Sequence, residues 1–316
     1  MNENRWSRRS VLTAIPGLVM GAAGIAPGTD GQSVKWSSGD ERPKTKVPAN
    51  ATDCHYHIYD SHYPVDPNAT LRPADATVAD YRLLQKRIGT NRGVIIQPST
   101  YGTDNRLLLE ALGRFGLAFA RGVAVVNTSV TDAELKRLHA GGVRGIRFNL
   151  VQAGATTLDI VDPLSKRVAA FGWHIQVNAS ADQIAAAKDL WNRVPCSIVY
   201  DHLGHVPEPQ GISHPVFGVI RELLQRGRAW VKLSGFYIDT RVGPPTYADS
   251  VSVAKAYVKE APERLVWGSD WPHPTMKENE KPNDAILLDL MADCVPNEAM
   301  RNRILGDNAA KLYGFV

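Results

Sequence analysis

From about residue 50 onward, short runs rich in apolar and β-branched residues alternate with amphipathic stretches. Such runs occur eight times, at residues 51–59, 92–99, 117–127, 142–150, 172–179, 196–204, 229–235 and 264–271. The stretches between them carry apolar residues at helical spacing, as in 76–88 and 104–115. Strands that alternate with helices in this way predict an α/β fold, a (β/α)8 TIM-type barrel built as a single domain.

Residues that begin and end helices stand between the predicted strands. Ser180 and Asp104 lie where N-caps are expected, and Gly141 and Gly172 lie where helices should stop. The main alternative is an open, doubly wound sheet. No glycine-rich phosphate loop follows the first predicted strand, which disfavours that alternative.

The start of the chain carries a different pattern. Arg8 and Arg9 precede a weakly apolar, glycine-containing run at 11–25. This order is typical of a twin-arginine export signal, and the run is too short and too rich in glycine for a good membrane span. We therefore expect residues 1–26 to be a twin-arginine-type signal segment. The expected partner is the twin-arginine export machinery, the expected location is the periplasm, and no stable membrane insertion is expected.

Composition narrows the picture of the remaining chain. Residues 27–49 are rich in Gly, Ser, Pro and charge, which predicts a disordered tail or linker before a barrel over 50–316. Hydrophobic residues make up 44% of the 316 residues, enough for one large core. The net charge of +4 is modest and no basic cluster with interleaved aromatic residues occurs, so no nucleic-acid partner is expected. The three cysteines match no metal-binding spacing and are expected to be buried thiols.

Polar side chains gather where the predicted strands end. A barrel carries its catalytic groups at the carboxyl ends of its strands, and strand residues two apart share a face. Charges inside a barrel are costly unless they are paired or catalytic, so these residues predict an active site. They are His55 and His57 from the first run, Ser99 from the second, Arg147 and Asn149 from the fourth, His202 and His205 from the sixth, and Asp270 from the eighth. His174 opens the fifth run instead, so we expect it to be a structural residue at the opposite end.

The chain resembles a known superfamily at these positions. A His-X-His in the first strand, a histidine in the sixth and an aspartate in the eighth resemble the amidohydrolase superfamily. The longer motifs TDCHYHIYD, QPSTYGTDNR, GIRFNL, WHIQ, DHLGH, VKLSG and WGSDWPHP are similar to the 2-pyrone-4,6-dicarboxylate lactonase group. That group also contains sugar-acid lactonases, sulfomuconolactone hydrolase and galactarolactone isomerase. The resemblance runs from about residue 50 to the C-terminus.

The resemblance implies a hydrolase that opens a small carboxylated lactone, an anionic cyclic ester. Asp270 would be the general base, and His55, His57 and His202 would surround the lactone carbonyl as an oxyanion site. The expected substrate-binding residues are Arg147, Arg144, Asn149, Ser99, Tyr63, His205 and Arg241. The chain departs from the group at His205, where the dicarboxylate lactonase has arginine, and in having Arg241 as the only arginine of the seventh-strand loop. A second substrate carboxylate would therefore find fewer partners.

Whether a metal takes part is a separate question. The resemblance implies no cofactor and no metal for this group. The alternative is one divalent metal such as Zn held by His55, His57, His202 and Asp270. A binuclear centre would need other ligands where the chain has Asn149 and Asn178.

Three alternatives to a lactone hydrolase stay open. One is a lactone isomerase of the galactarolactone type, and another is a mononuclear-metal hydrolase or decarboxylase of the same superfamily. The third is a periplasmic binding protein without catalysis, which would not need the base that Asp270 supplies. A panel of lactones, assayed with and without a chelator, would separate them.

Overall fold

The computed structural model describes Met1 and residues 33–152 and 156–315. Eight parallel strands follow one another in chain order around a nearly closed barrel. They are β1 (Thr52–Tyr56), β2 (Arg92–Ile96), β3 (Ala120–Ala124), β4 (Val143–Asn149), β5 (His174–Asn178), β6 (Ile198–Tyr200), β7 (Ala229–Leu233) and β8 (Leu265–Trp267). The predicted (β/α)8 single-domain barrel is confirmed.

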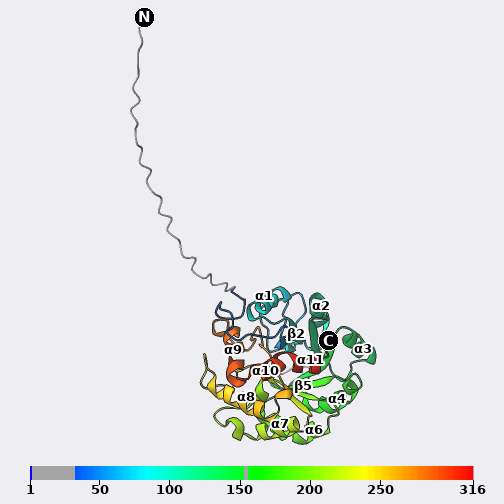
Figure 1. Cartoon of the computed structure of the whole chain (residues 1–316). Helices are drawn as coiled ribbons and strands as arrows, with labels where there is room; N and C mark the ends of the chain where they lie inside the picture. Colours follow the sequence, from blue (N-terminus) through cyan, green and yellow to red (C-terminus); the bar gives the residue numbers. More distant parts are fainter. Residues whose placement is uncertain (2–32, 153–155, 316) are drawn as a thin grey trace. The chain divides into compact units, whose positions relative to one another are not determined.

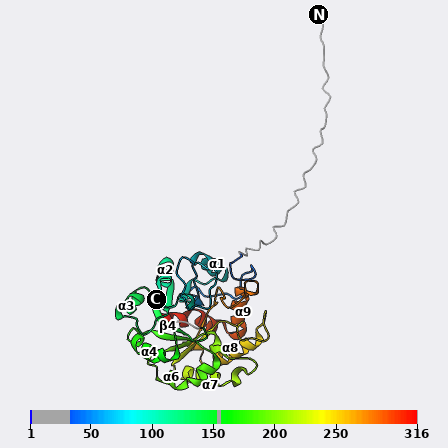
Figure 2. The same ribbon diagram turned by 180° about the vertical axis from the view of Figure 1, so that it is seen from behind.

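Helices surround the strands in both views of the molecule (Figures 1 and 2). They are α1 (Val78–Ile88), α2 (Arg106–Phe115), α3 (Asp132–Ala140), α4 (Val161–Ala169), α5 (Ala181–Ala186), α6 (Lys188–Arg193), α7 (Pro215–Gln225), α8 (Ala248–Glu260), α9 (Asp284–Cys294), α10 (Glu298–Asn302) and α11 (Asn308–Tyr313). Ser180 caps α5 in a capping box, and Gly141 is the C-cap of α3, as the sequence predicts. Asp104 lies one residue before Asn105, the N-cap of α2, and Gly172 lies two residues beyond the C-cap of α4.

Two apolar layers hold the barrel together. The larger lies between the strands and the surrounding helices, where outward residues such as Ile146 and Val231 are buried. The smaller fills the barrel interior, where Val94 and Val199 pack with Tyr313 and Phe315 from the end of the chain. Figure 1 shows α10 and α11 lying across the strands. The C-terminal segment thus packs against the barrel interior at the amino ends of the strands. The carboxyl ends, where the polar residues lie, are left available for a functional site.

Buried Asp53 joins the first strand to the segment after the last. Its carboxylate accepts hydrogen bonds from the Ser269 backbone (2.9 Å), the Ser269 hydroxyl (2.6 Å) and Tyr81 (2.9 Å). Burial raises the pKa of Asp53 to about 6 although these hydrogen bonds oppose the shift. The backbone nitrogen of Asp270 then donates to His55 (2.8 Å). The seam between β1 and β8 is therefore closed by side chains and loop backbone, directly beneath Asp270.

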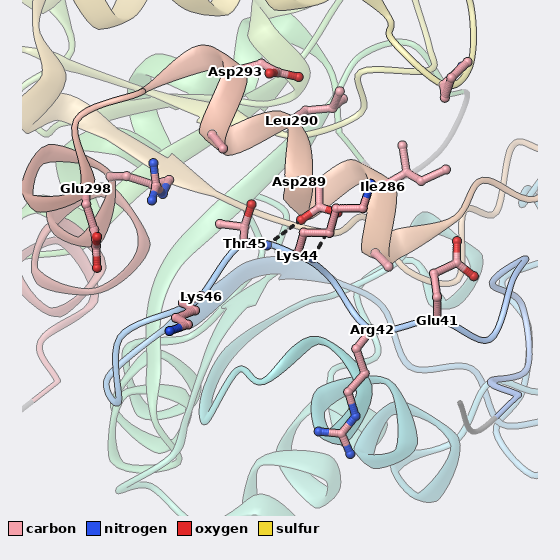
Figure 3. A pocket seen from close by; sticks show the side chains of 14 residues that line it. Glu41, Arg42, Lys44, Thr45, Lys46, Ile286, Asp289, Leu290, Asp293 and Glu298 are labelled. Atoms are coloured by element: carbon pink, nitrogen blue, oxygen red, sulfur yellow. Dashed lines mark hydrogen bonds between the residues drawn. The ribbon is translucent and has the colours of Figure 1, made fainter. Parts of the chain in front are cut away.

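The segment that precedes the first strand packs on the barrel from Val34 onward, which differs from the expected disordered tail. Val34 is buried, and the backbone oxygen of Lys35 accepts a hydrogen bond from the Trp271 indole (2.8 Å). Asp289 of α9 accepts the backbone N–H groups of Lys44 (3.1 Å) and Thr45 (2.7 Å), as Figure 3 shows. Composition alone missed these contacts because each is made to a residue distant in the sequence.

Candidate active site

A cavity of about 260 Å³ lies at the carboxyl ends of the strands. Leu71, Pro98 and Ile238 supply part of its apolar lining. Its charged and polar lining includes His57, Ser99, Arg147, Asn149, Asn178, His202, His205 and Asp270. All but Asn178 of these polar residues were singled out from the sequence, and the size suits a single small ring.

Four predicted catalytic side chains converge at the inner end of this cavity. Oδ1 of Asp270 lies 3.4 Å from Nε2 of His55, 3.5 Å from Nε2 of His57 and 3.9 Å from Nε2 of His202. His55 is fully buried and does not line the cavity, whereas His57 and His202 do. His57 and His202 are therefore placed where a substrate could reach them, whereas His55 contacts Asp270 from the buried side.

Asp270 is held ionised in a constrained conformation. Burial favours the neutral acid, but the adjacent histidines hold the pKa of Asp270 well below its usual range. Its φ of 64° lies in the left-handed region, where a residue with a side chain costs about 1–3 kcal/mol. The Tyr237 hydroxyl donates to Oδ2 (2.6 Å), so Oδ1 is the oxygen that faces the histidines. These contacts fix the direction of Oδ1, which is placed as a proton acceptor at the inner end of the cavity.

His57 and His202 have defined hydrogen-bond partners behind them. Nδ1 of His57 lies 2.8 Å from the Ile96 carbonyl oxygen, which can only accept, so Nδ1 carries a proton. Nδ1 of His202 lies 3.0 Å from the Ser234 hydroxyl. Burial lowers the pKa of His202 to about 4, which makes its ring neutral at pH 7. Both rings are thereby fixed with Nε2 toward Asp270.

A fully buried ionic layer lies below the histidines. The Lys232 ammonium donates to Gln176 (2.8 Å) and lies 3.2 Å from Nδ1 of His55. Oδ1 of Asp201 lies 3.4 Å from Lys232 and 3.3 Å from His55, without a well-aligned hydrogen bond to either. Burial lowers the pKa of Lys232 to about 8. Burial alone would raise the pKa of Asp201, but the adjacent Lys232, His55 and Arg147 hold that pKa well below its usual range. The layer fixes His55 from behind.

Arg147 joins this layer to the cavity. Its Nε donates to Oδ2 of Asp201 (3.1 Å), and its side chain also lines the cavity. Within the described part of the chain, the terminal guanidinium nitrogens of Arg147 make no hydrogen bond to another residue. A guanidinium oriented through Nε presents its remaining donors to a carboxylate. The predicted role of Arg147 as the anchor of an anionic substrate agrees with this placement.

Neutral polar side chains form one continuous wall. Asn149 donates to Ser99 (2.7 Å), and Asn178 donates to Asn149 (2.9 Å). His205 donates from Nε2 to Asn178 (2.7 Å), and its Nδ1 lies 3.1 Å from Asp239. Each of these amide and hydroxyl groups keeps a free donor or acceptor position. The wall can therefore bind ring oxygens or hydroxyls beside the carboxylate that Arg147 would hold.

Three predicted substrate-binding residues lie elsewhere. Arg144 donates to the backbone oxygens of His139 (3.0 Å) and Val143 (2.7 Å) at the amino end of β4, the end of the strand opposite the cavity. Tyr63 is outside the cavity and its hydroxyl bonds Glu110. Arg241 is exposed in its loop, where its backbone nitrogen donates to Asp249 (2.6 Å). The structure therefore does not bring these three side chains to the cavity.

His174 begins β5 and is buried, as expected of a structural residue. Its ring packs edge-on against Tyr313 at a centroid distance of 5.3 Å, and its Nε2 has no hydrogen-bond partner. Burial lowers its pKa to about 3.

The converging side chains fit one divalent metal ion. A tetrahedral zinc ion with bonds of about 2.0–2.1 Å separates its ligand atoms by about 3.4 Å. Nε2 of His55 and Nε2 of His57 lie 3.3 Å apart, and Asp270 lies at 3.4 and 3.5 Å from them. One ligand atom each from His55, His202 and Asp270 lie within 4.8 Å of one another. Imidazole nitrogens and a carboxylate oxygen are the ligands that zinc takes, so this donor set could hold it.

Sequence reasoning missed the residues that support the site. Lys232 lies within an apolar predicted strand, and Asp201 stands where another such strand ends. Burying a charge is costly unless it is paired, so both positions could have been recognised as functional from the sequence. His273 follows the eighth predicted strand within the motif WGSDWPHP but was given no role. Tyr237 and Asp284 had no comparable signal, because only the folded loops bring them together with His273.

The predicted signal segment falls on residues that the structure does not describe, apart from Met1. Within the described part of the chain, no helix is long and apolar enough to cross a membrane.

The family model and the similar proteins of known sequence agree with one another. The family model described as amidohydrolase matches residues 52–315. A 2-pyrone-4,6-dicarboxylate hydrolase of Comamonas testosteroni is 32% identical over 88% of this chain and 94% of its own length. A D-galactarolactone isomerase of Agrobacterium fabrum is 30% identical over 86% of this chain and 93% of its own. An apo crystal structure from Agrobacterium tumefaciens, 28% identical, superimposes with a TM-score of 0.83 over 89% of this chain and 99% of its own.

Proposed function

The chain belongs to the amidohydrolase family, and from this membership and its site we propose an enzyme of the lactone hydrolase and isomerase group. The observation that carries the proposal is the ionised Oδ1 of Asp270, surrounded by histidine nitrogens at the inner end of a cavity that also holds Arg147. The specific reaction proposed is hydrolysis of a small lactone that carries a carboxylate.

The chemistry follows from the positions of the side chains. Arg147 binds the substrate carboxylate, and Oδ1 of Asp270 takes a proton from water as the water oxygen attacks the lactone carbonyl. We propose that Ser234 donates to Nδ1 of His202, so that the ring proton lies on Nε2 and stabilises the carbonyl oxygen as it gains charge. The ring carbon–oxygen bond then breaks, and the leaving alkoxide takes the proton back from Asp270. General-base help contributes about 10²–10⁴-fold and one oxyanion donor about 10²–10³-fold.

A divalent metal, if bound, would be held by His55, His57, His202 and Asp270. It would supply Lewis-acid polarisation of the carbonyl or a more acidic water. The roles of Arg147 and of the neutral polar wall are the same in either case.

The cavity also bears on the kind of lactone. Arg147 is the only lysine or arginine among the described lining residues, whereas amides and hydroxyls follow one another along the wall beside it. We propose a ring with one carboxylate and one or more hydroxyls, in preference to a dicarboxylate.

Isomerisation is the second candidate, favoured by the D-galactarolactone isomerase among the relatives. The same base could take a proton from a substrate hydroxyl, which would then attack the lactone carbonyl and form a ring of another size. The two reactions differ in whether water enters the product.

The test is turnover on a panel of sugar-acid lactones, muconolactones and a neutral ester, with and without a chelator. We expect ring opening of a hydroxylated, singly carboxylated lactone with release of one proton. Lactone isomers without proton release would favour the isomerase. Binding without turnover across the panel would contradict both reactions and favour a binding protein.

Export remains a proposal that rests on Arg8 and Arg9. We propose twin-arginine transport to the periplasm. Replacing both residues with lysine should leave precursor in the cytoplasm, in a comparison of cell fractions by immunoblot. Unchanged periplasmic delivery of the double-lysine form would contradict it.

A further inference from the structure

A chain of buried side chains runs outward from the back of Asp270. The Tyr237 hydroxyl lies 2.6 Å from Oδ2 of Asp270 and 3.1 Å from Nδ1 of His273. Nε2 of His273 lies 3.1 Å from Oδ2 of Asp284. His273 and Asp284 are fully buried and line no part of the cavity. We propose that His273, held by Asp284, is a positioning residue that fixes Tyr237 on Asp270 and so aims Oδ1 at the substrate.

The two inner hydrogen bonds of this chain have only one consistent direction when Asp270 is ionised. Tyr237 has one hydroxyl proton, and the short distance to Asp270 shows where it goes. The Tyr237 oxygen must therefore accept from Nδ1 of His273, and one proton lies between Nε2 of His273 and the Asp284 carboxyl group. His273 is thus held between Tyr237 on one side of its ring and Asp284 on the other.

The outer end of the chain is anchored on two separate elements. Asp284 is the first residue of α9, where a carboxylate is favoured by the helix dipole. Nη2 of Arg87 lies 4.0 Å from the Asp284 carboxylate, and Nη1 of Arg87 donates to Gly39 (2.8 Å). Ser37 bonds both Arg87 and the Asp284 backbone nitrogen. Ser37 and Gly39, in the segment before β1, therefore hold the outer end of the hydrogen-bonded chain that begins at Asp270.

The backbone shows why such support is needed. Asp270 and His273 have φ of 64° and 56°, both in the left-handed region. Two such residues cost about 1–3 kcal/mol each unless neighbouring contacts hold them. The backbone nitrogen of His273 donates to the backbone oxygen of Asp270 (2.8 Å), and the Lys281 ammonium donates to the backbone oxygen of His273 (2.7 Å). His273 thus stabilises both the turn that carries Asp270 and the hydroxyl that orients it.

Burying a histidine–aspartate pair is costly, and well-packed apolar residues of similar size are often at least as stable. A role in orienting Asp270 accounts for keeping the pair. The inference rests on the proposed function, because it assigns the pair to the residue that acts as base.

The test compares kcat and KM for four variants, Tyr237→Phe, His273→Leu, His273→Asn and Asp284→Asn. A hydrogen bond to a charged group contributes about 1.5–3 kcal/mol, so losing the one to Asp270 should lower kcat about 10–100-fold. We expect that loss for Tyr237→Phe and His273→Leu, a smaller loss for Asp284→Asn, and KM within about twofold of wild type because Arg147 is untouched. His273→Asn places an amide donor near the position of Nδ1 and should recover most of the activity.

His174→Asn is the matched control, because it changes a buried histidine at the other end of the barrel. It should lower Tm without lowering kcat. A crystal structure of His273→Leu should show the Asp270 carboxylate rotated, which needs no substrate to observe. A kcat loss that follows Tm in every variant, the control included, would overturn the inference. So would a stable His273→Leu variant with wild-type kcat.

Asp270→Asn, assayed beside them, separates failure of the inference from failure of the function. If Asp270→Asn is inactive while His273→Leu is unaffected, only the positioning role is wrong. If Asp270→Asn hydrolyses as fast as wild type, the proposed function fails as well.

Discussion

The two ends of the barrel carry the same kinds of buried polar residue in opposite surroundings. At the carboxyl ends, Arg147 pairs with Asp201 and turns its free donors to a cavity. Near the amino ends, Arg121 donates to backbone oxygens of Ala120 (3.0 Å) and Gly314 (2.7 Å). The first arrangement leaves donors for a ligand, while the second uses them to fix the chain terminus. Residue type alone therefore does not separate a binding arginine from a structural one.

The histidines differ in the same way. His57 and His202 face Asp270 at the cavity and have partners behind their rings. His174 has an unpartnered Nε2 and packs against an aromatic ring. A buried polar group without a hydrogen-bond partner costs stability, so the His174 ring destabilises the fold, whereas the partnered rings of His57 and His202 do so less.

The largest effect is expected at Asp270. Asp270→Asn keeps the size of the side chain and removes the proton acceptor, so kcat for the best lactone should fall about 10²-fold or more. Metal content is measured on the same samples. Lost turnover in a protein that never held metal supports catalysis by the side chains alone, and loss of both supports the metal alternative. Near-normal kcat would remove Asp270 from the mechanism.

The arginine comparison should give the next largest effect. Lysine cannot copy bidentate binding of a carboxylate, so Arg147→Lys should raise KM for an anionic lactone about 10–100-fold, and for a neutral ester much less. Arg144→Lys, the matched change at the amino end of the same strand, should leave both KM values unchanged. Equal KM increases for the two substrates in Arg147→Lys would show that Arg147 only supports the barrel.

Chelation tests whether the converging histidines hold a metal. If they do, dialysis against a chelator should remove about one equivalent per chain and abolish turnover, and zinc should restore it. If catalysis uses side chains alone, turnover should be unchanged. Metal analysis by mass spectrometry together with lactone assays distinguishes the two.

The smallest effect is a pH dependence of stability at the other end of the barrel. Burial lowers the pKa of His174 from 6.5 to about 3, so below pH 6.5 the unfolded chain binds a proton that the folded chain does not. Stability is therefore fully present above pH 6.5 and is lost as pH falls toward 3, by about 2 kcal/mol at pH 5. His174→Asn should make the fall of unfolding free energy between pH 6.5 and 5 shallower, as urea titrations would measure. An unchanged slope would contradict the buried, neutral state.

Local patterns sufficed to predict the barrel and several of the side chains that meet at the cavity. The eight strands were predictable because each is a short apolar run, and His57, His202 and Asp270 because they close such runs. Arg144 lies away from the cavity because it stands near the amino end of β4, whereas Arg147 and Asn149 stand near its carboxyl end. Tyr63 and Arg241 lie in loops, whose direction no local periodicity encodes.

The supporting residues could not be predicted in the same way. Tyr237, His273 and Asp284 come from three segments, and Ser37 lies in a stretch whose composition resembles a linker. Their roles depend on contacts between distant segments, which a single sequence does not specify. Lys232 is the exception, since a lysine within a buried strand already indicates a partner.

The central claim is that Asp270 activates water against a carboxylated lactone. Its most direct test is single-turnover reaction of the best panel lactone in isotopically labelled water, with wild type and Asp270→Asn side by side, followed by mass spectrometry of the product. We predict one labelled oxygen in the new carboxylate for wild type and no product from Asp270→Asn in the same time. An unlabelled, rearranged lactone, or labelled product from Asp270→Asn at the wild-type rate, would contradict the claim.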